Sequence, residues 1–328
     1  MNTKLSLVTL GLRVLLIAGS LSCGTSHAQG WPARPVRIVV ATAPGGTADT
    51  LGRLIAQKLT EDFKQNFVVE NRTGAGGVIA CELVTKAAPD GYTLLVVGGT
   101  THTILPTLTK NLPYDSVRDF THIALLGGPP SVLVVHPGLP ARDLKEFIAL
   151  ARAQPGKLTY GSPGNGTTGH LTAEHFKQLS GIDMTHVPYK GASPAVADLM
   201  AGHLPVASTT LATAATQIRA GKVKALALSS ATRVPDFPNV PTFAELGYPE
   251  LTALAWFALS GPAGMPQEIV QRLNAEVRRI LQLADVRERL RPEGFEPGNL
   301  DSQAFTAFVA AELKRWAPVA RASGMRVD

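Results

Sequence analysis

The sequence predicts an α/β protein built from two similar lobes, and three observations carry this prediction. Short β-branched or apolar segments alternate with longer segments whose apolar residues recur at helical spacing. Glycine-rich loops join a strand to a helix at 43–49 and again at 161–169. The order of strand, loop and helix at 38–56 returns in coarse form at 158–179. Such alternation is typical of mostly parallel sheets flanked by helices.

The first lobe is predicted to begin with repeated strand–helix units. Short β-branched runs indicate buried strands, and Pro or Gly clusters mark where each strand ends. The predicted strands lie at 36–41, 67–70 and 92–97, and the predicted helices lie at 47–60 and 78–87.

The second lobe repeats this order, and the chain then returns to the first lobe. We predict strands at 131–136, 158–161, 184–187, 206–210 and 223–229, and helices at 144–153, 170–179 and 194–201. A further strand is expected at 254–260, followed by helices at 266–283 and 302–320. The last two helices have no strands of their own and should pack on the first lobe. Pro266 suits a first helical turn, and Asp301 or Ser302 suits an N-cap.

Length and composition agree with two folded domains. The 328 residues are 45% hydrophobic and 17% charged, which excludes a disordered chain. The net charge is +6 without a run of five basic residues, so nucleic-acid binding is not expected. We assign residues 29–128 and 252–328 to lobe 1 and residues 129–251 to lobe 2.

The N-terminus predicts a secretory signal peptide covering residues 1–28. An apolar stretch at 5–21 precedes Ser-His-Ala-Gln at 26–29, which favours cleavage after Ala28. A membrane anchor is less favoured because Arg13 interrupts the apolar stretch. Cys23 leaves lipid attachment open, although the usual Leu three residues before it is missing. We therefore expect a secreted protein whose one remaining cysteine, Cys81, is a buried apolar residue.

The two glycine-rich loops are the candidate binding segments. Glycines between a strand and a helix let backbone N–H groups face a ligand, and the helix N-terminus favours an anion. In the first loop, Asp49 can either complement the helix dipole or contact a ligand. In the second loop, we expect an anion cradle formed by Ser162, Asn165, Thr167, Thr168 and backbone N–H groups. Replacement of Thr167 by Ala should then weaken binding and change stability little.

Other chemistries fit the sequence less well. The first loop lacks the Gly-Lys-Ser/Thr ending of a P-loop. The pattern Gly164-x-Gly166-x-x-Gly169 is a weak dinucleotide match, because Ser162 and Pro163 separate the strand from the first glycine. The eight histidines form no zinc pattern, and His170 is expected to be a hydrogen-bonding residue at a helix start. No cofactor, metal or catalytic residue is predicted.

An ordered set of motifs resembles the Bug family of periplasmic solute-binding proteins, which are linked to tripartite tricarboxylate transporters. The resemblance covers residues 31–328. The motifs are PGGTAD (44–49), VENR (69–72), GAGG (74–77), APDGYTL (88–94), LPYD (112–115), YGSPGNG (160–166), HL (170–171), VPYKG (187–191) and PTFAELG (241–247).

The resemblance implies a two-lobed, hinged α/β fold of the type II periplasmic-binding-protein kind, with a small carboxylate in the cleft between the lobes. It places one end of the ligand at the loop after the first strand and the other end at the second glycine loop. Thr100, Thr101 and His102 should form the floor of the cleft. The full set of expected ligand-binding residues is Pro44, Gly45, Gly46, Thr47, Asp49, Thr100, Thr101, His102, Ser162, Asn165, Gly166, Thr167, Thr168 and Thr209.

The strand at 202–210 departs from the family pattern. By position, Pro205 and Thr209 replace aspartates that are common in the family. If Thr209 borders the cleft, a threonine there suits a hydroxyl or carboxylate better than an ammonium group. We therefore expect a dicarboxylic, hydroxy or aromatic acid rather than an amino acid.

The sequence thus predicts a monomeric extracytoplasmic receptor that passes a small carboxylate to membrane transporter subunits and is not an enzyme. Two alternatives remain open. One is a secreted enzyme acting on an organic acid, and the other is a ligand sensor that docks on a receptor ectodomain.

Overall fold

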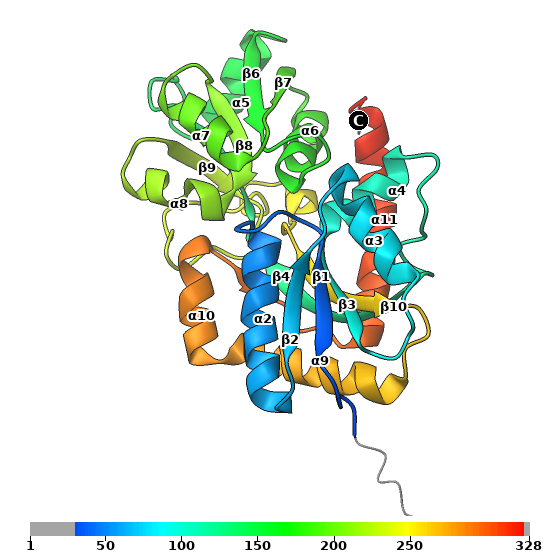
Figure 1. Cartoon of the computed structure of the whole chain (residues 1–328). Coiled ribbons are helices and arrows are strands. Elements are labelled where there is room, and N and C mark those ends of the chain that lie inside the picture. The colour runs from blue at the N-terminus through cyan, green and yellow to red at the C-terminus, as the bar shows by residue number, and fades with distance from the viewer. Residues whose placement is uncertain (1–29, 325–328) are drawn as a thin grey trace, which may run out of the picture. The chain divides into compact units, whose positions relative to one another are not determined.

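Two β-sheets, each flanked by helices, organise residues 34–324 (Figure 1). The computed structural model describes residues 30–324, apart from the side chain of Glu293. The predicted signal peptide, its cleavage site and Cys23 lie outside the described residues. Within the described part of the chain, no helix combines the length and the apolar character needed to cross a membrane.

The first sheet has six strands in the order β11-β4-β10-β3-β1-β2. Strand β1 pairs in parallel with β2 and β3, whereas β10 is antiparallel to β3 and β4, and β11 is antiparallel to β4. The bounds are β1 Val36–Val40, β2 Phe67–Asn71, β3 Thr93–Gly98, β4 Phe120–Gly128, β10 Phe257–Pro262 and β11 Glu296–Pro297.

The second sheet has five strands in the order β7-β6-β8-β5-β9. Strand β6 is parallel to β7 and β8, whereas β5 is antiparallel to β8 and β9. The bounds are β5 Ser131–Val135, β6 Leu158–Ser162, β7 Met184–Pro188, β8 Val206–Thr210 and β9 Lys224–Leu228.

Both sheets are therefore mixed, which corrects the prediction of mostly parallel sheets. The difference arises where the chain passes between the sheets. Strand β4 continues into β5 through Pro129 and Pro130, and the connection after β9 returns to the first sheet as β10. A parallel neighbour needs a crossover connection within one sheet, and neither passage is one. Strand β10 is therefore antiparallel to β3 and β4, and β5 is antiparallel to β8 and β9.

The two passages lie side by side and are joined by hydrogen bonds. The Ser131 N–H donates to Ser229 Oγ at 2.8 Å, and that hydroxyl donates to the Ala253 carbonyl at 2.6 Å. Pro130 and Leu254 form an isolated antiparallel bridge. A single serine side chain thus ties both connecting segments together.

The helices follow the predicted positions closely. Helices α9 and α11 pack against β4, as expected for helices without strands of their own (Figure 1). Asp301 is the N-cap of α11 and accepts from the Ala304 N–H at 2.7 Å, whereas Pro266 is the N-cap of α9 and precedes the first turn. Cys81 is fully buried, as predicted. The bounds are α2 Thr47–Phe63, α3 Val78–Thr85, α4 Leu105–Leu108, α5 Leu144–Ala153, α6 Thr168–Ser180, α7 Ala192–Met200, α8 Leu211–Arg219, α9 Gln267–Gln282, α10 Ala284–Leu290 and α11 Ser302–Ala322.

Candidate functional site

The first loop, residues 43–46, leads from β1 to an open helix N-terminus. Pro44, Gly45 and Gly46 are exposed, and Gly45 has φ of +83°, which favours glycine. Gly46 is the N-cap of α2 and offers no side-chain acceptor to the first turn. Because the first N–H groups of a helix have no intrahelical acceptor, the turn beginning at Thr47 presents unsatisfied donors and a positive dipole end.

Asp49 holds the first loop in place through hydrogen bonds of its buried carboxylate, which does not face the exposed side of the loop. The carboxylate accepts from the Gly45 N–H at 2.9 Å, from Arg53 Nε at 3.0 Å and from Asn71 Nδ2 at 2.8 Å. The residue is only 3% exposed, and the Arg53 hydrogen bond is the main reason that its pKa falls to about 2. The sequence left open whether Asp49 complements the helix dipole or contacts a ligand. In the structure, its carboxylate instead binds Gly45, Arg53 and Asn71 within the protein.

A guanidinium lies on the wall facing the first loop. A pocket of about 140 Å³ is lined by Gly45 and Thr47 on one side and by Arg289 and Phe295 on the other. Arg289 is exposed and makes no ion pair or hydrogen bond with the described residues. The sequence analysis missed Arg289 because it did not predict α10, although the spacing of Val286 and Leu290 by four residues is a helical signal.

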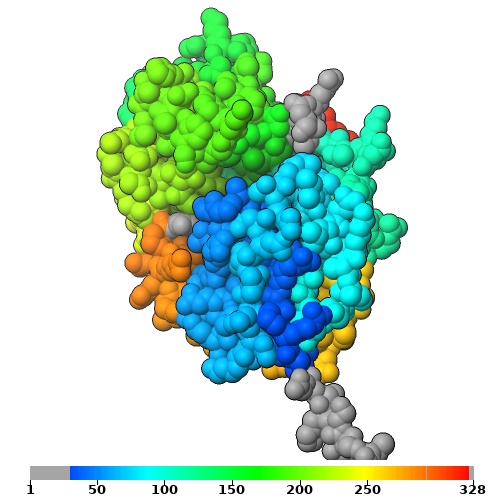
Figure 2. Space-filling model, viewed as in Figure 1, coloured from blue at the N-terminus to red at the C-terminus, as the bar shows by residue number. Residues whose placement is uncertain are grey.

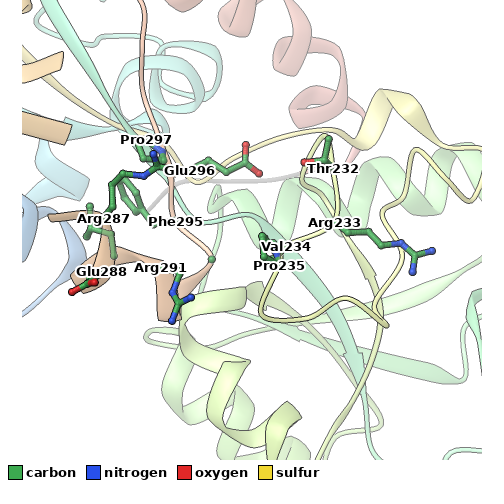
Figure 3. A pocket seen from close by; sticks show the side chains of 12 residues that line it. Thr232, Arg233, Val234, Pro235, Arg287, Glu288, Arg291, Phe295, Glu296 and Pro297 are labelled. Carbon is green, nitrogen blue, oxygen red and sulfur yellow. The ribbon is translucent and has the colours of Figure 1, made fainter. Parts of the chain in front are cut away.

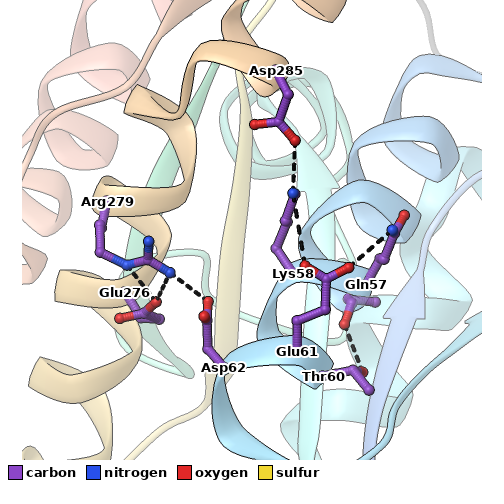
Figure 4. A network of polar contacts seen from close by, with 9 residues as sticks. Gln57, Lys58, Thr60, Glu61, Asp62, Glu276, Arg279 and Asp285 are labelled. Carbon is purple, nitrogen blue, oxygen red and sulfur yellow. Dashed lines mark hydrogen bonds and ion pairs between the residues drawn. The ribbon is translucent and has the colours of Figure 1, made fainter.

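Ion pairs fix α10 and α9 beside α2 and thereby place Arg289 (Figure 4). Lys58 Nζ lies 2.7 Å from Asp285 Oδ2, and the pair joins α2 to the first turn of α10. Arg279 of α9 lies 2.6 Å from Asp62 at the end of α2. The wall that carries Arg289 is therefore attached to the helix whose N-terminus it faces.

The second loop, residues 162–167, uses most of its polar groups internally. Thr167 Oγ1 donates to the Gly164 carbonyl at 2.8 Å and accepts from the His170 N–H at 3.4 Å, so it caps α6. The buried Ser162 hydroxyl lies 2.7 Å from His186 Nε2. Asn165 is exposed. The Thr167 hydroxyl thus has a structural task that the sequence analysis did not assign to it.

His170 holds the second loop, as its predicted role at the helix start requires. Its Nδ1 accepts from the Gly166 N–H at 3.3 Å. The ring stacks on His186 with centroids 3.7 Å apart. Burial lowers the pKa of His170 to about 3 and the pKa of His186 to about 4, so both rings are neutral at pH 7.

Thr100, the first of the three residues 100–102 predicted to form the cleft floor, contacts the second loop. Its hydroxyl donates to the Gly166 carbonyl at 3.2 Å, and Thr100 and Thr168 line the same narrow gap. Thr101 instead faces the adjacent glycine turn, where its hydroxyl donates to the Gly76 carbonyl at 3.0 Å. In Figure 2 the blue surface of the first loop and α2 lies directly against the green surface of the part that carries the second sheet.

Two predicted contact residues lie elsewhere. His102 is 0% exposed and packs against Phe120 and His122 at ring-centroid distances of 4.8 and 5.5 Å. Burial holds its pKa well below the usual range. His102 belongs to a buried aromatic cluster. It therefore does not form the floor of a cleft, contrary to the prediction from the sequence. The short π-helical turn Thr100–Ile104 directs it into this cluster.

Thr209 does not border a cleft in this structure. It is 0% exposed, pairs directly with Val132 in the β5–β8 ladder, and its hydroxyl has no hydrogen-bond partner among the described residues. Directly paired residues point to the same face of a sheet, and Val132 lies in the apolar core under α7 and α8. The predicted preference for a dicarboxylic, hydroxy or aromatic acid over an amino acid was based on Thr209, and this residue does not support it.

Comparisons with known proteins show the family. The sequence model described as "Tripartite tricarboxylate transporter family receptor" matches residues 51–325. Protein BugT of Bordetella pertussis is 35% identical over 330 residues, covering 100% of both chains. The solved structure of R. palustris Rpa4515 with adipate is 37% identical, covers 90% of this chain and 99% of that chain, and has a TM-score of 0.79.

Two further solved structures agree. MatC from Rhodopseudomonas palustris with bound malate is 35% identical, with a TM-score of 0.75 and coverage of 88% of this chain and 100% of that chain. The periplasmic binding protein BugD is 29% identical, with a TM-score of 0.75 and coverage of 90% and 99%. The two-sheet α/β architecture is thus the two-lobed fold of periplasmic binding proteins, and the chain belongs to the tripartite tricarboxylate transporter receptor family, which includes the Bug solute-binding proteins.

Proposed function

We propose that this protein is a periplasmic receptor that binds a small dicarboxylate in the cleft between its two lobes. The observation that carries the proposal is the open N-terminus of α2, with Asp49 behind it and Arg289 facing it. One carboxylate accepts from the backbone N–H groups of the first turn of α2, which begins at Thr47. Arg289 is a source of charge for the same ligand and supports a dicarboxylate over a monocarboxylate.

The second loop completes the proposed site from the other lobe. Within this loop, the hydroxyls of Ser162 and Thr167 form hydrogen bonds inside the protein. The side chains of Asn165 and Thr168 are the ones left to contact a ligand. Adipate and malate, the ligands of two similar structures, are both dicarboxylates. We therefore take dicarboxylates of four to six carbons as the ligand class.

The proposal includes a hinge between lobe 1, residues 29–128 and 252–328, and lobe 2, residues 129–251. The Ser229 contacts with both connecting segments support this division. Closure around the ligand would create the surface that the membrane transporter subunits recognise. We expect a monomer in solution, and we expect capture of transporter subunits from detergent-solubilised membranes to increase with bound ligand.

Calorimetric titration with adipate, malate and hexanoate tests the ligand proposal. The dicarboxylates should bind and hexanoate should bind more weakly. Arg289→Ala should weaken dicarboxylate binding by about 10- to 100-fold, the usual range for a lost charge-assisted hydrogen bond. Arg287→Ala is the matched control, because Arg287 is on the same helix but does not line the first-loop pocket.

Two results would contradict the proposal. Saturable binding of a neutral sugar, with no heat from any carboxylate, would mean that the loops do not form an anion site. Equal affinity of the Arg289→Ala variant and the unaltered protein for both dicarboxylates would remove Arg289 from the site.

A further inference from the structure

A second and larger pocket lies beside the proposed dicarboxylate site. It has a volume of about 660 Å³, within the range of small-molecule sites. One wall is the segment Thr232–Pro235, which follows β9, and the other comprises α10 and the residues up to Pro297 (Figure 3). Among the described residues, it shares only Leu290 and Phe295 with the first-loop pocket.

The walls of this pocket are mainly apolar. Val234, Leu290 and Phe295 are buried hydrophobic residues, and two prolines, Pro235 and Pro297, extend the same surface. Figure 3 shows Phe295 on one side of the space and Val234 and Pro235 on the other. A ligand with an apolar body would pack against this surface and bury its own apolar area.

Two carboxylates, Glu288 and Glu296, interrupt the apolar lining, and Glu296 is the more buried of the two. Glu296 is half-buried, and its side chain makes no hydrogen bond or ion pair with any described residue. Burial raises the pKa of its carboxyl group above the usual value. Figure 3 shows this carboxylate on the side of the pocket that faces Thr232. This carboxylate is partly desolvated and has no partner in the described protein, so a cation that enters the pocket could pair with it.

Three arginines line the pocket, and none of them forms an ion pair with Glu296; Arg287 has no ion pair with any described residue, and the other two are engaged elsewhere. Arg233 is engaged by Glu245 at 2.9 Å and by the Pro238 carbonyl at 2.8 Å. Arg291 lies 3.8 Å from Asp236 on the other lobe. In Figure 3 the guanidinium groups of both arginines point away from Glu296. The carboxylate is therefore available to a cation that enters the pocket.

We propose that this pocket is a second ligand site, which binds a small primary amine with an apolar tail. The ammonium group donates to the Glu296 carboxylate, and the tail packs against Val234, Leu290 and Phe295. An organic anion is disfavoured because it would meet Glu296, and no group of three metal-ligating side chains exists among the described residues. This site does not depend on the proposed dicarboxylate function, since its ligand carries the opposite charge.

Calorimetry of the purified protein with n-hexylammonium chloride tests the proposal. We expect saturable binding, with affinity rising roughly threefold to fourfold for each methylene from propylammonium to hexylammonium. Glu296→Gln should weaken binding by about tenfold or more, because a charge-assisted contact is lost. Glu288→Gln is the matched control: Glu288 lines the same pocket, is exposed and points away from Glu296 in Figure 3.

The outcomes separate this proposal from others. Glu296→Gln should keep its thermal stability, since it removes a partly desolvated charge that has no ion pair with the described residues, and it should still bind adipate as the unaltered protein does. The proposal is overturned if hexylammonium gives no saturable heat, or if Glu296→Gln and Glu288→Gln bind it equally well. Equal affinity for hexanol and hexylammonium would show an apolar pocket in which Glu296 recognises nothing.

Discussion

The two glycine-rich loops look alike in sequence, but the structure uses them differently. Each lies between a strand and a helix and contains several glycines. The first loop leaves the N-terminus of α2 without a side-chain cap, and its carboxylate, Asp49, points back into the loop. In the second loop, Thr167 caps α6 and the Gly166 N–H is taken by His170.

The difference teaches that a glycine-rich loop before a helix is an anion site only where its donors remain free. Pattern alone shows how many N–H groups a loop contains, whereas the hydrogen bonds decide how many of them face a ligand. In this protein the first turn of α2 retains its donors, although the Gly45 and Gly46 N–H groups are engaged by Asp49 and by the Ala43 carbonyl. The second loop contributes mainly shape, Asn165 and Thr168.

The largest expected effect is that of Asp49→Ala. The change releases Gly45, Arg53 and Asn71 together, so the first loop should lose its shape and adipate affinity should fall by at least about tenfold. Unfolding free energy should fall by about 1–2 kcal/mol, a value reduced because Arg53 is half exposed. Denaturant titration and calorimetry measure the two effects. Glu61→Ala removes an exposed acid of the same helix that contacts only Lys58 and Gln57 at the surface, so affinity should stay unchanged and stability should change by less than about 0.5 kcal/mol.

The same carboxylate predicts a pH dependence. The pKa of Asp49 is lowered from 3.8 to about 2 by its partners, so the folded state favours the ionised form. This contribution to stability should be complete above about pH 5 and disappear as the pH falls towards 2. Asp49→Ala should show a flatter stability profile over that range. Parallel profiles for the variant and the unaltered protein would contradict the role given to Asp49.

An intermediate effect is expected for Thr167→Ala, and it reverses the expectation from sequence. Loss of the N-cap of α6 should lower stability by about 1 kcal/mol, while adipate affinity should change little. Thermal unfolding with and without adipate measures both quantities. Thr168→Ala, one residue on, should leave stability unchanged. If adipate affinity fell strongly while stability stayed unchanged, the Thr167 hydroxyl would be a ligand contact and this prediction would be wrong.

The smallest effect is expected for Thr100→Val, which removes the hydrogen bond to the Gly166 carbonyl. A bond of this kind contributes about 0.5–1.5 kcal/mol, so adipate affinity should fall roughly twofold to tenfold. Thr100→Ser keeps the hydroxyl and should restore binding in the same calorimetric titration. If Ser and Val at this position behave alike, Thr100 acts through its shape rather than through this bond.

Much of the fold could be predicted because its signals are local. The β-branched run of β1, the Asp301 cap and the apolar spacing of α9 and α11 depend on neighbouring residues. Strand β4 was not predicted, and neither was α8, whose sequence LATAATQIR has few large apolar residues. The mixed sheets were missed because strand direction depends on how the chain passes between the lobes.

The site was predictable as a set of segments but not residue by residue. Glycine and threonine patterns located the loops, because backbone N–H groups act there without a particular side chain. The buried positions of His102 and Thr209 depend on a π-helical turn and on the register of β5 with β8, which no local pattern encodes. Arg289 reaches the first loop only through the ion pairs between α2 and α10.

Amide NMR of the isotope-labelled protein during an adipate titration tests the central claim most directly. If the carboxylate is held at the open N-terminus of α2, the amide protons of Thr47 and Ala48 should show the largest shifts, moving downfield with adipate concentration. Shifts confined to residues 164–168, with residues 45–48 unmoved while adipate binds, would contradict the account and assign the anion to the second loop.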